Sequence, residues 1–196
     1  MAFFTAWRHK GNDAFTTLTE YQEKELWRLN RFYWKEARRC EDAKAYLAGC
    51  VMLGSSLENI LILMINLYNH DAERTGKVPH RNGQPKPILK WDLAELITVA
   101  KAAGWLPAGL KLGEDWNSRK ARVGDYAEVA RMMRNLAHPA RYLKDHAGHR
   151  VTSKYLQRQF EIVLTCRDWL AAHNNRELLK AIEEEEKEEA RPQTSS

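Results

Sequence analysis

Two arginines, an asparagine and a histidine stand close together in the segment RMMRNLAHP. Arg131, Arg134 and His138 fall at positions i, i+3 and i+7, so an α-helix would place them in one column, with Asn135 beside them. Two guanidiniums and an imidazole in one column repel one another when all are charged, and an anion between them would relieve that repulsion. Because guanidinium offers phosphate paired donors, the spacing indicates a phosphate-binding face.

The imidazole of His138 adds acid–base chemistry to this face. A neutral imidazole can accept the proton of an RNA 2′-hydroxyl, and the arginines can stabilise the charge that builds on the phosphoryl oxygens during attack. Such cleavage needs no metal ion, and we expect neither a metal nor a cofactor. The ordinary alternative is a solvated arginine face with a histidine–proline pair at a helix end. Spacing alone favours this alternative, because arginine and histidine are common at helical spacing.

The helix that must position these residues is predicted to run from Asp125 to His138, because Pro139 disfavours helical geometry in the residue before it. His138 would then lie at the C-terminal end of a helix. The opposite side of this helix is apolar and is expected to face the core. The residues on that side are Tyr126, Val129, Ala130, Met133, Leu136 and Ala137.

Helices are predicted along the rest of the chain as well. The predicted segments are Leu18 to Arg39, Glu41 to Asn69, Asp92 to Ala103, a helix capped by Thr152 or Ser153 that runs to about His173, and a last helix from about Asn175. No segment shows the sustained alternation of a β-strand. About six helices in 196 residues predict an all-α helical bundle. We expect one domain over residues 1–174, followed by an acidic helix and tail over 175–196.

The segment from Ala45 to Tyr68 is apolar over about the 20 residues that a bilayer requires. Glu58 lies near its centre, and a central carboxylate costs roughly 2.5–3.5 kcal/mol on membrane insertion. A buried core helix is therefore the preferred interpretation, with no membrane partner. The three cysteines form no C-x-x-C pair, which indicates neither a disulfide framework nor a zinc site. We expect the protein in the reducing cytoplasm.

Glu58 belongs to a polar seam on this otherwise apolar helix, together with Ser55, Asn59 and Asn66. A buried carboxylate needs a cationic partner, and Arg131 or Arg134 could supply it. A core glutamate that pairs with water or with a helix cap is the alternative.

A basic segment and an acidic tail bear on possible partners. Residues 73–90 hold three prolines and two glycines and are predicted to form a loop, which is either an RNA contact or a solvated linker. The candidate RNA contacts are Arg74, Lys77, Arg81 and Lys86 of this loop, and Arg141 beyond it. Residues 183–189 hold six glutamates and one lysine, so the net charge of +5 divides into −5 there and +10 elsewhere. The tail either competes with RNA for the basic body or is a solvated helix end.

The segment RMMRNLAHPARYL resembles the signature of the HEPN superfamily, the all-α RNA-targeting domains of bacterial toxins and antiphage systems. That signature is an arginine, often followed by asparagine, and then a histidine, in the form R-x4–6-H. Six residues separate Arg131 from His138, which fits the spacing, whereas Asn135 follows Arg134, which fits the polar-residue rule. The segment LGSSLENIL is similar to the core helix of bacterial HEPN-like families, including an acidic residue at Glu58. The likeness covers roughly residues 43–170.

The resemblance implies a metal-independent endoribonuclease that acts in toxin–antitoxin or antiphage defence. It assigns catalysis to Arg131, Arg134, Asn135 and His138, with Glu58 in support. It also implies a homodimer that joins two motifs in one basic cleft, and a cognate antitoxin or defence protein as a further partner. The alternatives are a catalytically inactive HEPN-like module that binds RNA or protein through the same face, and a purely structural helical adaptor.

Overall fold

The computed structural model describes residues 18–106, 123–145 and 150–189. Within these ranges the chain forms seven α-helices, and the fold is the all-α bundle that the sequence predicts. The helices are α1 (Glu20–Asp42), α2 (Tyr46–Leu67), α3 (Asn69–Arg74), α4 (Leu93–Ala102), α5 (Val123–Asn135), α6 (Pro139–Asp145) and α7 (Ser153–Glu189). Between α3 and α4 lie the two-residue strands β1 (His80–Arg81) and β2 (Gln84–Pro85) and the 3₁₀ helix η1 (Ile88–Lys90).

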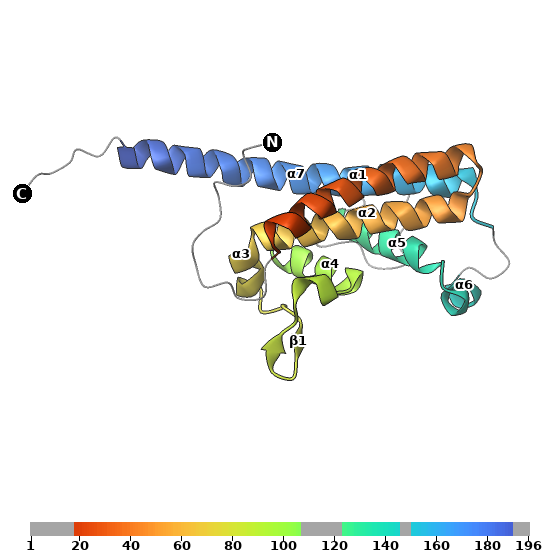
Figure 1. The fold of residues 1–196 in the computed structure, drawn as a ribbon, viewed down its shortest axis with the longest axis horizontal. Helices are drawn as coiled ribbons and strands as arrows, with labels where there is room; N and C mark the ends of the chain where they lie inside the picture. The colour runs from red at the N-terminus through yellow and green to blue at the C-terminus, as the bar shows by residue number, and fades with distance from the viewer. Residues whose placement is uncertain (1–17, 107–122, 146–149, 190–196) are drawn as a thin grey trace, which may run out of the picture.

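Helix α2 is the centre of the bundle. It packs against α1 and α7, and also against α4 and α5, which Figure 1 shows on the side of α2 away from α1. Every fourth residue along one side of α2 is fully buried: Leu53, Leu57, Leu61 and Ile65. By length and composition α2 could cross a membrane, but 72% of its apolar window is buried inside the bundle. The prediction of a buried core helix here is confirmed.

Polar groups fix the register of α1 against α2. Asn30 donates through Nδ2 to the carbonyl oxygen of Ser56 at 3.1 Å, and Asn66 donates to Oε1 of Glu23 at 2.5 Å. The backbone N–H of Leu18 donates to Oδ1 of Asn66 at 2.7 Å. A buried polar group that loses its partner costs about 1–3 kcal/mol, so a slip of one helix along the other would be unfavourable.

The start and the end of α4 agree with the prediction. The carboxylate of Asp92 accepts from the backbone N–H of Glu95 at 2.9 Å, and the Glu95 carboxylate accepts from the N–H of Asp92 at 2.7 Å, which is a capping box. Gly104 follows the helix with φ +74°, a conformation that favours glycine. The four predicted core residues are all buried: Leu93, Leu96, Ile97 and Ala100.

The prediction of a structureless loop over residues 73–90 is wrong in its middle. β1 and β2 pair antiparallel, with His80 opposite Pro85, and the turn between them is Asn82–Gly83 with φ 53° and 76°. Positive φ at both turn residues is the hairpin geometry that Asn–Gly favours. The strands are only two residues long, too short for alternation to signal them.

The predicted break near Asn175 is also wrong, because α7 is one continuous helix of 37 residues. At about 1.5 Å per residue it is roughly 55 Å long, against roughly 35 Å for α1 with its 23 residues. Asn174 lies inside this helix, and its side chain accepts a hydrogen bond from the hydroxyl of Tyr68 at 2.9 Å. The C-terminal end of α7 therefore projects beyond the bundle (Figure 1).

Candidate functional site

The candidate residues lie where α5 turns into α6. α5 ends at Asn135, and the next three backbone N–H groups each donate to the carbonyl three residues earlier, at 3.2, 3.3 and 3.0 Å. The carbonyl oxygen of His138 then accepts from Tyr142 at 2.9 Å, and Pro139 is the first residue of α6. Proline suits a first helical position because its missing N–H would have no partner there.

The predicted helix end at His138 is therefore wrong by three residues. His138 directly precedes α6, and a single turn joins it to the last residue of α5. Its side chain is exposed, and Asn135 is partly exposed at the last position of α5. Both side chains are placed where a solvent-borne ligand can reach them.

Arg134 points toward α2, which corrects the prediction that it faces away from the core. It continues the face of α5 that begins with Ala127 and Ala130, both fully buried. A Cβ built on Gly54 of α2 would stand 2.6 Å from Cβ of Arg134 and 3.1 Å from its Cγ. The missing side chain at Gly54 is thus what lets the stem of Arg134 lie on the backbone of α2.

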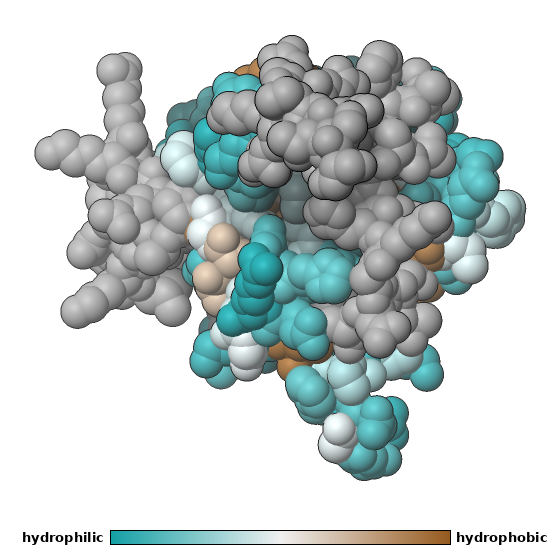
Figure 2. Space-filling model, turned by 90° about the vertical axis from the view of Figure 1, so that its left-hand side faces the viewer, coloured by the Kyte–Doolittle hydropathy of each residue, from teal (hydrophilic) through white to brown (hydrophobic). Residues whose placement is uncertain are grey.

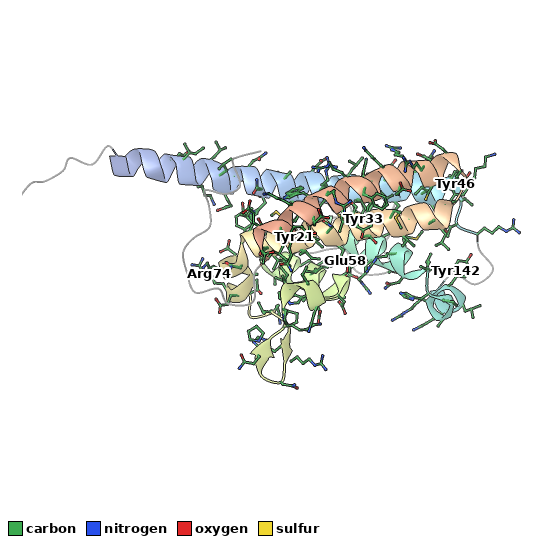
Figure 3. All side chains as sticks on the ribbon, viewed as in Figure 1. Tyr21, Tyr33, Tyr46, Glu58, Arg74 and Tyr142 are labelled. Carbon is green, nitrogen blue, oxygen red and sulfur yellow. The ribbon has the colours of Figure 1, made fainter. Side chains whose placement is uncertain are left out.

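The guanidinium of Arg134 pairs with Glu58, one helical turn beyond Gly54. Nη2 of Arg134 lies 2.7 Å from Oε2 of Glu58, with side-chain exposures of 31% and 20%. The predicted cationic partner of Glu58 is therefore Arg134 and not Arg131. Figure 3 shows Glu58 on α2, beside the region where α4 and α5 pack.

The pKa of Glu58 is raised above its ordinary value. Burial is the largest cause, the positive charge of Arg134 opposes it, and the carboxylate of Asp92 on the α4 side adds to the rise. The ion pair alone would lower this pKa, so desolvation outweighs the attraction. The pair holds Arg134 in position, and its attraction only partly offsets the cost of burying the charged carboxylate.

Arg131 does not share a site with Arg134. Its Nε lies 2.8 Å from Oε2 of Glu128, three residues earlier on α5, and both side chains are 29% exposed. The repulsion expected between two uncompensated arginines is absent, because each guanidinium has its own carboxylate. An anion that binds here must therefore share or displace Glu58 or Glu128.

The apolar side of α5 is rotated from its predicted place. Ala127 and Ala130 are fully buried and Leu136 is 6% exposed, whereas Ala137 is exposed. Ala137 lies in the turn after the helix, so the helical wheel does not apply to it. Tyr126, Val129 and Met133 are partly buried against the core, as the prediction requires.

The candidate RNA contacts separate into two groups at different ends of the molecule. Arg141 is exposed on α6, while Arg74 lies on α3 and Lys77, Arg81 and Lys86 lie on or near the hairpin. Figure 3 shows Arg74 and Tyr142, the latter beside Arg141 in sequence, on opposite sides of Glu58 along the bundle. These two groups do not form one site.

Within the hairpin group the cations differ in their availability. Lys86 is partly buried, with its Nζ 2.6 Å from Oε2 of Glu95, and Arg74 pairs with Asp71 at 3.3 Å on the surface. Lys77 and Arg81 are exposed. The hairpin is the lowest part of the molecule in Figure 2, where its surface is mainly hydrophilic. Lys86 thus stabilises the base of the hairpin, and Lys77 and Arg81 are the cations it presents to solvent.

Sequence reasoning missed Gly54 as a residue of this site. The signal was present, because Gly54 and Glu58 stand at i and i+4 and therefore share one face of α2. A small residue one turn before a carboxylate on an apolar helix favours close approach of a second helix that carries a cation.

The structure gives little support to other chemistries among the residues it describes. No three His, Cys, Asp or Glu side chains in these ranges are grouped to hold a metal ion. Cys50 is fully buried, and burial raises its pKa to about 12, so it is a poor nucleophile.

No protein-family model matches this sequence, and neither a curated protein nor a solved structure is significantly similar to it.

Replacing Glu58 with glutamine should change how stability depends on pH. Because the pKa of Glu58 is raised in the folded chain, this group contributes stability at low pH that is lost as the pH rises through the raised value. The free energy of unfolding of the wild type, minus that of Glu58→Gln, should fall as the pH rises above the ordinary glutamate pKa of about 4.3. Urea unfolding at several pH values measures this difference. A difference that rises with pH would mean that the Arg134 ion pair outweighs burial.

Replacing Gly54 with alanine should destabilise the bundle. The new methyl group would overlap Arg134, and overpacking costs about 1–3 kcal/mol. Alanine regains only about 0.5–1 kcal/mol over glycine within a helix. The neighbouring change Ser55→Ala, at a partly exposed position, is the control and should stay within about 0.5 kcal/mol of the wild type. Equal stability of Gly54→Ala and wild type would show that α5 shifts freely on α2.

Proposed function

We propose that this protein is a metal-independent endoribonuclease of the HEPN type. The observation that carries the proposal is the fixed position of Arg134, held by Gly54 and Glu58, four residues before an exposed histidine. With 31% of its side chain exposed, Arg134 can keep Glu58 on one side and offer guanidinium N–H groups to a phosphate on the other. The helical fold and the resemblance of the motif support the same proposal.

In the proposed reaction His138 accepts the proton of a 2′-hydroxyl. The 2′-oxygen then attacks the adjacent phosphorus, and the bond to the 5′-oxygen of the next nucleotide breaks. Arg134 stabilises the charge on the phosphoryl oxygens, and the leaving oxygen takes a proton from water. The products are a 2′,3′-cyclic phosphate and a 5′-hydroxyl. Asn135 and Arg131 flank the site and would position the RNA strand.

The proposal also covers the RNA-binding surface, the oligomeric state and the control of the enzyme. Arg141 next to the turn, and Lys77 and Arg81 on the hairpin, would attract the RNA backbone. The resemblance further suggests a cytoplasmic toxin or antiphage component that forms a homodimer and is controlled by a cognate protein. The acidic residues 183–189 would weaken RNA binding by competing for the basic surface.

A second candidate is an RNA- or protein-binding module without catalysis. The pairing of both arginines with carboxylates favours it, since Glu58 and Glu128 occupy the groups that a phosphate would need. Cleavage and binding are separable experimentally, because only cleavage depends on the imidazole.

The substitution His138→Ala should abolish RNA cleavage and leave the fold unchanged, because the side chain is exposed. Loss of a general base lowers the rate by about 100-fold to 10,000-fold. The assay follows labelled RNA and tests for 2′,3′-cyclic phosphate ends, with a chelator present. The matched control is His80→Ala, an exposed histidine on the hairpin, which should retain activity. Varied RNAs that all remain intact with the wild type would leave the binding module as the function.

The two arginines need different controls in that assay. Arg131→Ala removes a partly exposed side chain, whereas Arg134→Ala would leave Glu58 buried without its cation. The double variant Glu58→Gln/Arg134→Met avoids that charge and tests the role of Arg134 itself. We expect this variant to lose more activity than Arg131→Ala.

RNA binding should weaken steeply with salt if the basic groups make the contact. For single strands the slope of log K against log salt is about 0.7 per neutralised phosphate, so Lys77→Ser/Arg81→Ser should reduce it by roughly 1.4. Fluorescence anisotropy over a salt series measures the slope. Lys24→Ser, on the exposed surface of α1, is the control and should leave it unchanged. An unaltered slope in the hairpin variant would place the contact elsewhere.

A further inference from the structure

Three large apolar side chains near the projecting end of α7 are exposed to solvent. Leu178, Leu179 and Ile182 are 37%, 61% and 42% exposed and stand at i, i+1 and i+4, so they share one side of the helix. Isolated helices shorter than about 12–15 residues are marginal in water, and amphipathic packing usually stabilises them. This end of α7 thus has the properties of a helix that packs against a partner.

The same end of α7 is strongly acidic. Residues 183–189, directly beyond Ile182, hold six glutamates and one lysine. A parallel pairing of two such ends would bring their glutamates together and is therefore unfavourable. The partner that suits this end is a surface with exposed apolar groups and positive charge.

The outer face of α1 is such a surface on this same chain. Between Trp27 and Arg39 the helix holds five cations and one anion. Trp27 and Phe32 are 42% and 46% exposed among them. Three of the five cations pair with glutamates of α1 at the surface, where such pairs contribute little, whereas Arg31 and Lys35 make no ion pair with a described residue. The five exposed cations are Arg28, Arg31, Lys35, Arg38 and Arg39, and the guanidinium of Arg38 lies over the Phe160 ring of α7 at 4.0 Å.

We propose that the end of α7 in one copy packs on the outer face of α1 in a second copy, and that the contact is reciprocal. The charges are complementary, −5 on residues 183–189 against +4 on residues 27–39, and both surfaces expose large apolar groups. Within one chain α7 continues straight out of the bundle, away from the middle of α1 (Figure 1). Each copy carries both surfaces, so a closed two-fold pair satisfies both contacts.

This pairing is independent of the proposed ribonuclease activity. α1 packs on α2 on the side away from α5, so the contact leaves Arg134 and His138 uncovered (Figure 1). It therefore differs from a dimer that joins two motifs in one cleft. A chain that cleaves no RNA could still assemble in this way.

Sedimentation equilibrium of the full chain tests the proposal. We expect twice the chain mass of 22.8 kDa at micromolar concentration, with dissociation favoured as salt screens the charges. Arg28→Glu/Arg31→Glu/Lys35→Glu changes the charge of residues 27–39 from +4 to −2, and Glu183→Lys/Glu185→Lys/Glu186→Lys/Glu189→Lys changes that of residues 183–189 from −5 to +3. Each variant alone should be monomeric, because like charges then oppose one another in both contacts.

Mixing the two variants gives the decisive result. In the mixed pair, the acidic α1 face of one variant meets the basic α7 end of the other. The second contact joins an unchanged α1 face to an unchanged α7 end, so a one-to-one heterodimer should form. The control is Lys77→Glu/Arg81→Glu on the hairpin, which should remain dimeric. Circular dichroism checks that each variant is folded. A monomeric wild type, or two variants that stay dimeric alone, would overturn the proposal, as would a mixture that stays monomeric.

Discussion

The close approach of α5 to α2 at Gly54 determines where the candidate chemistry lies. Only a residue without a side chain leaves room for the stem of Arg134 on the backbone of α2. Glu58, one turn farther along, then fixes the guanidinium at 2.7 Å. The turn that carries His138 directly follows the end of α5 that Arg134 holds against α2. The position of His138 therefore depends on the contacts of Arg134 with Gly54 and Glu58. The position of the imidazole is thus a property of helix packing and not of the loop alone.

The sequence predicted those parts of the fold where local and long-range forces agree. The capping box at Asp92 and the buried face of α4 are local patterns that tertiary packing reinforces. Arg134 was placed wrongly because a helical wheel treats every arginine as solvent-facing, and the glycine that changes this lies eighty residues away. Pro139 was ambiguous in principle, since proline both follows a helix end and begins the next helix. The break predicted between His173 and Asn175 is absent, and the contact of Asn174 with Tyr68 could not be known from the sequence.

Several basic side chains of the molecule are neutralised locally by neighbouring carboxylates. Arg131, Arg134 and Lys86 each have a carboxylate within 3 Å, so a count of basic residues overstates the positive surface. Among the described residues, exposed cations lie on and near the hairpin, on α6, on the outer face of α1 and on α7. Under both proposals, the remaining cations and the apolar groups among them would select a polyanion or an acidic helix. The proposed ribonuclease role rests on the types of these residues, and the structure adds which of them are exposed.

The central position of α2 has a consequence for biogenesis. Its partner α1 precedes it in the chain. Helix α7, whose Leu156 packs against Gly49 of α2, begins only at Ser153. At roughly 5–20 residues per second, the ribosome needs on the order of 5–15 seconds between finishing α2 and starting α7. During that interval the most apolar helix of the chain lacks its last covering surface. Apolar surface exposed for this long favours aggregation, so slower translation between α2 and α7 would lengthen the period of risk.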